Sequence, residues 1–281
     1  MPKQIDFEWL KGQARDNLSR SLIDEIAMWR QSTLENNRFV EGDELFYLHL
    51  GNYQLWFRKG SAFSSVEVYC EIFKENNHFV VPGFSGEDVG VIVDIGANEG
   101  FYALKIKENN PGCKIFCLEP NPYAYQILKR NIETNGLQDV VLINKAVGPE
   151  NGEIALQVVK EIAAIGGKDL RIGHRPWLKD EFITDIKVEA VTLDKLFCEY
   201  DIEQVDILKI DVEGMEREIL AGSGDVFQKV KKTIIERHSP SLRNWVIDFL
   251  SGKNFTVAFE EDPGFEHYYG DIYFVNKSCS A

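Results

Sequence analysis

Two acidic side chains in the middle of the chain stand near the ends of short apolar runs, with a glycine turn between them. Asp94 precedes a turn that contains Gly96 and Gly100, and Glu119 follows the next apolar run. Glycines let the backbone turn tightly and approach a ligand closely. The helical pattern after Gly100 would offer free N–H groups to an anionic group. We therefore expect this loop to bind a ligand, the alternative being a plain packing turn.

The spacing of the two glycines argues against a dinucleotide ligand. The dinucleotide fingerprint is G-x-G-x-x-G, whereas this loop reads G-x-x-x-G. Asp94 would repel a pyrophosphate but suits a cationic group such as an ammonium. Glu119 follows the first glycine by roughly the 20 residues of one βαβ unit. It could accept hydrogen bonds from ribose hydroxyls, or only favour the next helix N-terminus. An adenosine ligand that is cationic and lacks phosphate fits both acids, and S-adenosyl-L-methionine meets that description.

A second group of acids, with a histidine, follows two later apolar runs. Asp211 and Glu213 come after the run at 205–210, and Glu236 and His238 end the run that begins at residue 231. Ligands of open α/β sheets bind at the carboxyl ends of the strands, so Asp211 could hold a cofactor ammonium or a substrate group. His238 is the first candidate to take a proton from an acceptor hydroxyl, and Glu213 is the second. Glu236 shares the strand parity of His238 and could orient it.

These residues also have simpler interpretations. Asp211 and Glu213 could only cap the short helix that follows, and a lone histidine is often structural. A cluster of Asp, Glu and His can also hold a divalent cation. Nothing in this spacing requires one, and no metal is predicted.

The elements that must position these residues are short apolar runs that alternate with helical patterns from residue 91 onward. Such alternation predicts βαβ units and a parallel sheet with helices on both faces. Asn121 and Ser239 are suited to cap two of the helices, each followed by a proline. The last two runs have no helix between them and predict an antiparallel hairpin at the end of the sheet. The runs are 89–95, 114–119, 139–147, 205–211, 231–236, 254–260 and 271–276.

The first ninety residues differ from the rest. Residues 1–45 look mostly helical, with Leu18, Leu22, Ile26 and Trp29 at a spacing that predicts one buried face. The segment 47–57 has β character, and 64–73 reads as a helix or a strand. Proline and glycine then interrupt the chain. We expect an N-terminal helical/β extension over 1–90 and the ligand-binding domain over 91–281.

Composition excludes several classes of protein. The 281 residues carry a formal net charge of -14, which argues against a nucleic-acid substrate, because binding phosphates requires cations. No stretch approaches the roughly 18 to 20 apolar residues of a membrane span. The N-terminus lacks the apolar core of a secretory signal, and the five cysteines show no CxxC spacing. These features indicate a cytoplasmic protein with no membrane or nucleic-acid partner.

Several blocks of the sequence resemble the FkbM family of S-adenosylmethionine-dependent methyltransferases over roughly residues 45–276. The blocks are VDIGANEGFYAL, LEPNPYAYQILKRNIETNGL, INKAVGPENGEIAL, VTLDKL, VDILKIDVEGMEREILAGSGDVF and IIERH. The resemblance implies a Rossmann-like class I methyltransferase, α/β, with a seven-stranded, mostly parallel sheet and an antiparallel last strand. Members of the family methylate hydroxyls of small molecules, polyketides or sugars, so a small-molecule or saccharide acceptor is expected.

The same resemblance assigns residues to the cofactor. Asp94, Gly96, Asn98, Gly100 and Glu119 would bind it, and the stretch around Asn144 and Ala146 would lie near adenine. Asp211 and Glu213 match the acidic turn of the family, and His238 matches its strand-end histidine. Ala97 and Pro120, which lie in the same two turns, complete the expected cofactor site.

Two other functions remain open at this point. An NAD-dependent oxidoreductase is disfavoured by the missing third glycine and by the acid before the loop. A binding or scaffold protein on the same fold is compatible with the sequence, because a fold does not fix a function. The stretch at 160–185, with His174, Arg175 and Trp177, is either a lid over the acceptor or a solvated loop.

Overall fold

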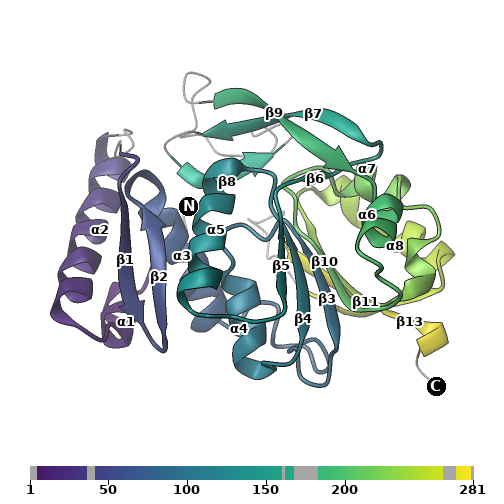
Figure 1. The fold of residues 1–281 in the computed structure, drawn as a ribbon, viewed down its shortest axis with the longest axis horizontal. Helices are drawn as coiled ribbons and strands as arrows, with labels where there is room; N and C mark the ends of the chain where they lie inside the picture. Colours follow the sequence, from purple (N-terminus) through teal and green to yellow (C-terminus); the bar gives the residue numbers. More distant parts are fainter. Residues whose placement is uncertain (1–4, 37–41, 160–161, 168–182, 262–269, 280–281) are drawn as a thin grey trace.

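A twisted seven-stranded sheet forms the centre of the molecule (Figure 1). The computed structural model describes residues 5–36, 42–159, 162–167, 183–261 and 270–279. The order of the sheet is β12-β13-β11-β10-β3-β4-β5. β13 runs antiparallel to β11 and β12, and all the other neighbouring pairs are parallel, which confirms the predicted sheet. The strands are β3 (Val91–Ile95), β4 (Lys114–Leu118), β5 (Val140–Ile143), β10 (Val205–Ile210), β11 (Val230–Arg237), β12 (Phe255–Glu260) and β13 (Gly270–Asn276).

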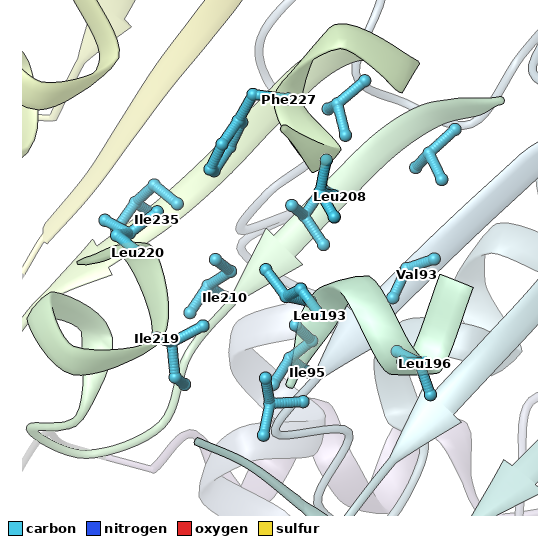
Figure 2. Packing of buried hydrophobic residues seen from close by; sticks show 14 of the residues in the cluster. Val93, Ile95, Leu193, Leu196, Leu208, Ile210, Ile219, Leu220, Phe227 and Ile235 are labelled. Atoms are coloured by element: carbon cyan, nitrogen blue, oxygen red, sulfur yellow. The ribbon is translucent and has the colours of Figure 1, made fainter. Parts of the chain in front are cut away.

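Helices cover both faces of this sheet, which explains why its inner strands are apolar along their length. One face packs on α6 (Leu193–Glu199), α7 (Glu216–Ala221) and α8 (Pro240–Gly252). The other packs on α4 (Phe101–Asn109) and α5 (Pro122–Thr134). Figure 2 shows Leu193 and Leu196 of α6 beside Val93 and Ile95 of β3. Because side chains alternate along a strand, Asp94 points to the opposite face, toward α4.

Two helices begin where the sequence predicted. The side chain of Asn121 accepts a hydrogen bond from the backbone N–H of Tyr123 at the start of α5. The Ser239 hydroxyl accepts one from the N–H of Leu242 at the start of α8. Each cap satisfies a backbone donor that has no partner inside the helix.

The N-terminal extension packs on α4 and α5. It contains α1 (Phe7–Gln13), α2 (Asn17–Asn36), β1 (Leu45–Leu50), β2 (Tyr53–Arg58), η1 (Lys59–Ser61) and α3 (Ala62–Phe73). Its buried residues share one core with Phe101 and Leu104 of α4, and the boundary near residue 90 stays a prediction. The buried face of α2 is shifted from the predicted one: Ile23 and Ile26 are fully buried, whereas Leu18 is 61% exposed.

A second sheet stands beside the carboxyl edge of the first, in the order β6-β9-β7-β8 (Figure 1). Its strands are β6 (Ala146–Val147), β7 (Gly152–Val159), β8 (Ile162–Gly167) and β9 (Ile183–Val191). It occupies part of the stretch at 160–185, of which 168–182, with His174, Arg175 and Trp177, lies outside the described residues. β8 contacts η1, α3 and α5. Among the described helices, none is long and apolar enough to cross a membrane.

Candidate active site

The glycine loop after β3 is pressed between two neighbouring elements. Gly96 and Gly100 have φ angles of +86° and +88°, which side chains rarely adopt. A Cβ atom on Gly96 would lie 1.7 Å from the carbonyl oxygen of Asp211, and one on Gly100 would lie 2.6 Å from Leu128. The protein's own packing therefore requires both glycines. Close approach of a ligand at these two positions stays a prediction.

Glu119 ties together the turns that follow β3, β4 and β5. One carboxylate oxygen accepts the N–H of Asn98 and the other accepts the N–H of Asn121, both at 2.8 Å. The exposed Asn144 donates its side-chain amide to the carbonyls of Glu119, at 2.7 Å, and Pro120, at 3.3 Å. Burial raises the pKa of Glu119 to about 7, although the two backbone hydrogen bonds oppose this rise. The predicted cofactor residues thus meet at one edge of the sheet.

Some of these residues are already engaged within the protein. The N–H groups of Gly96 and Ala97 both donate to the carbonyl of Leu118 at 2.9 Å. Ala146 is 4% exposed and begins β6, the strand that leads from the main sheet into the second one. Backbone N–H groups of the glycine loop therefore hold the turn after β3 against the end of β4.

A buried lysine links the carboxyl ends of β3 and β10. Lys209 is paired with Asp94 in the parallel register of these strands. Its ammonium lies 3.7 Å from a carboxylate oxygen of Asp94 and 3.0 Å from one of Asp211, and it stands over the ring of Tyr102. Asp94 is fully buried, and among the described residues neither of its oxygens has a hydrogen-bond partner. Burial raises the pKa of Asp94. Burial acts the same way on Asp211, but Lys209, Glu236 and His238 together outweigh it and lower the pKa of Asp211.

Four carboxylates, one of them that of Asp211, surround the imidazole of His238. Nδ1 lies 2.6 Å from Oε1 of Glu216. Nε2 lies 3.6 Å from Glu213, 3.8 Å from Asp211 and 3.9 Å from Glu236. His238 is 7% exposed. The structure therefore brings together all the residues that the sequence assigned to catalysis.

Burial and neighbouring charge act against each other in this group. Burial alone would lower the pKa of His238, but Glu236, Glu213 and Glu216 together outweigh it and raise that pKa above its ordinary value. Burial and the charge of Asp211 raise the pKa of Glu236. The surrounding carboxylates therefore favour the protonated form of the imidazole.

Comparison with known proteins identifies the family. The chain matches the Methyltransferase FkbM domain over residues 94–271, more than half of its length. The chain belongs to the FkbM methyltransferase family. It is an S-adenosylmethionine-dependent methyltransferase, and the NAD-dependent oxidoreductase and the scaffold are not favoured.

Three curated relatives cover much of the methyltransferase. Methyltransferase sdnD of Sordaria araneosa is 26% identical over 78% of this chain and 89% of the relative. The 31-O-demethyl-FK506 methyltransferase FkbM of Streptomyces tacrolimicus is 25% identical over 70% of this chain and 84% of the relative. The 2-O-methyltransferase NoeI of Sinorhizobium fredii is 27% identical over 50% of this chain and 60% of the relative.

A metal ion could in principle bind this methyltransferase at the carboxyl edge. Donor atoms of Asp211, Glu236 and His238 lie within 4.8 Å of one another, a grouping found among the residues that the structure describes. The ammonium of Lys209 already contacts Oδ2 of Asp211 at 3.0 Å, which satisfies that oxygen without a metal ion. The absence of a metal stays a prediction.

Sequence reasoning missed two residues of this site. Glu216, rather than Glu236, makes the short contact to the imidazole of His238. Lys209 was missed although it is a cation between apolar residues of the strand. Such an interrupted run signals a buried charge, which must find a partner. The position of Glu216, three residues after Glu213, carries no comparable signal.

Proposed function

We propose that this enzyme transfers a methyl group to a hydroxyl oxygen of a small molecule or saccharide. The observation that carries the proposal is the placement of the imidazole of His238. Glu216 holds its Nδ1. Its Nε2 faces Glu213, whose side chain is 27% exposed. A hydroxyl must lose its proton when it is methylated, and such a group can accept it. The names of two relatives, a 31-O-demethyl-FK506 methyltransferase and a 2-O-methyltransferase, support oxygen as the methylated atom.

The loops at the carboxyl edge suit the cofactor of the family. S-adenosylmethionine, when bound, supplies a methyl group that its sulfonium makes electrophilic. Glu119 would accept ribose hydroxyls, the stretch at 144–146 would lie near adenine, and Asp211 would face the ammonium. Asp94 has no exposed surface, so we propose that it acts through Lys209, whose ammonium lies 3.7 Å from Asp94 and 3.0 Å from Asp211. Among the described residues the oxygens of Asp94 have no hydrogen-bond partner and only the 3.7 Å ion pair with Lys209, which supports a polar ligand nearby, because buried polar atoms rarely lack partners.

His238 would take the proton of the acceptor hydroxyl at Nε2, with Glu213 as the second candidate. Glu236, whose pKa burial and Asp211 raise, lies 3.9 Å from the same nitrogen. These carboxylates favour the protonated imidazole, so the fraction of enzyme that is ready to accept a proton grows as the pH rises.

The acceptor is expected to be neither a nucleic acid nor a lipid bilayer. The net charge of -14 disfavours binding to phosphate backbones. We further propose a reducing compartment such as the cytoplasm. Cys70, Cys113, Cys117 and Cys198 are free thiols, and the first three of them are buried.

A binding titration followed by an acceptor screen tests the proposal. We expect S-adenosylmethionine and S-adenosylhomocysteine to bind the wild-type protein with micromolar affinity in calorimetry, and Glu119→Ala to bind them at least tenfold more weakly. Glu203→Ala, an exposed acid away from the site, is the matched control. Hydroxylated metabolites and saccharides are then screened by mass spectrometry. Methylation restricted to nitrogen or carbon acceptors would contradict the proposal.

A further inference from the structure

Glu216 is a charged residue in an interior position. It begins α7 and is 1% exposed. Its Oε1 lies 2.6 Å from Nδ1 of His238 and accepts the backbone N–H of Gly214 at 3.1 Å. Its Oε2 is buried and has no hydrogen-bond partner among the described residues. Burying a carboxylate costs several kcal/mol unless it is paired, so packing alone does not account for an acid here.

The position of Glu216 determines which ring nitrogen of His238 is available. A carboxylate accepts hydrogen bonds and cannot donate them when ionised, so the proton of the imidazole must lie on Nδ1. Nε2 then faces the turn that carries Glu213, 3.6 Å away.

We propose that Glu216 is the positioning residue of the active site, which fixes the Nδ1–H form of His238 and directs its Nε2 toward the methyl acceptor. The inference rests on the proposed function. It replaces the role that the sequence suggested for Glu236, whose carboxylate lies 3.9 Å from Nε2 of the imidazole. Glu216 need not touch the substrate, because it acts through His238.

The proton balance of the transfer follows from this arrangement. The acceptor O–H bond breaks as the new O–C bond forms, and the proton passes to Nε2 of His238. The electron pair of the breaking S–C bond remains on the cofactor sulfur. Nδ1–H stays hydrogen-bonded to Glu216, which stabilises the imidazolium without taking its proton. The imidazolium then releases the proton from Nε2 to water.

Several charged groups besides Glu216 act on His238. Lys209 of β10 contacts Asp211, and Asp211 in turn lies near the imidazole. The groups that face the imidazole or its partners are Glu216 on α7, Asp211 and Glu213 after β10, Glu236 on β11, Lys209 on β10 and Asp271 beside Glu236 on β13. Removing the charge of Glu216 while keeping the others should therefore lower the pKa of His238 without abolishing its rise.

Nuclear magnetic resonance of the histidine side chains tests this without an acceptor. The signal of His238, one of five histidines, is assigned by its loss in His238→Gln and titrated in wild type, Glu216→Gln, Glu216→Asp and Glu218→Gln. We expect a lower pKa in Glu216→Gln, partial recovery in Glu216→Asp, and no change in Glu218→Gln, the matched control on the same helix. An unchanged pKa and tautomer in Glu216→Gln would overturn the proposal.

Turnover provides the second measurement. With a hydroxyl acceptor, we expect Glu216→Gln to lower kcat by at least about tenfold, within the roughly 10²–10⁴-fold that general-base catalysis supplies, with the Kd of S-adenosylhomocysteine within about twofold. Reduced thermal stability with wild-type kcat would assign Glu216 a structural role only and overturn the inference. If no hydroxyl acceptor is methylated, the proposed function fails, while the titration still decides whether Glu216 controls the imidazole.

Discussion

Glu99 in the glycine loop offers a direct test of how burial controls ionisation in this fold. It is 1% exposed. The Ser65 hydroxyl lies 3.0 Å from the carbonyl of Ser61 and 2.9 Å from Oε1 of Glu99. A hydroxyl has one proton to donate, so both contacts are satisfied if Glu99 itself carries a proton. Burial raises the pKa of Glu99 to about 8, with Ser65 and Arg58 opposing the rise and Glu119 adding to it.

The magnitude follows from linkage. An unfolded glutamate titrates near 4.5 and the folded one at about 8, so between these values the folded state binds more protons. Stability therefore falls as pH rises through this range. At 1.36 kcal/mol for each pKa unit, the loss is about 3 kcal/mol by pH 7 and about 5 kcal/mol above pH 8. These figures are upper bounds, because any water that reached the carboxylate in the folded protein would reduce the rise of its pKa.

The perturbation is Glu99→Gln, which keeps the shape, stays neutral and can still donate to Ser65. We expect its free energy of unfolding to exceed that of wild type by an amount that grows from pH 5 to pH 8.5, approaching about 5 kcal/mol. Urea denaturation at fixed pH values measures this difference. Glu75→Gln, an exposed acid, is the control and should show no such growth. A Glu99→Gln difference that stays constant over this range would refute the reasoning.

Three further predictions concern the carboxyl edge of the sheet. Lys209→Met should destabilise the protein by about 3 to 5 kcal/mol in urea denaturation, because it leaves a buried aspartate without its countercharge; a loss under about 1 kcal/mol would contradict the pairing. Gly96→Ala should abolish cofactor binding or folding, since its Cβ would lie 1.7 Å from the Asp211 carbonyl. Gly136→Ala, at φ +62° with no atom within 4 Å of the added Cβ, should cost only about 1 kcal/mol, and equal losses by circular dichroism would argue against the steric account. The kcat/KM should rise with pH through a value above 6.5, because carboxylates raise the pKa of His238; a profile that falls over this range would exclude it as the base.

The sequence alone determined the main sheet and the start of two of its helices. Apolar runs that alternate with helical patterns report burial on both faces, and burial is a local property of each strand. The caps at Asn121 and Ser239 are equally local, since each side chain bonds to a backbone group within three residues. The acids at the strand ends were also predictable, because parallel strands bring their carboxyl ends to one edge.

Tertiary structure decided which partners these residues have. Lys209 and Asp94 are more than a hundred positions apart and meet only through the register of β10 and β3. Glu216 contacts His238 only when α7 packs against β11. A glycine is required at position 96 because the carbonyl of Asp211, which follows β10, lies where a Cβ atom would be. The sequence thus specifies which residues are buried and which cap a helix, because those preferences act over a few residues. Charge pairing and steric contact depend instead on distances that exist only after the sheet has assembled.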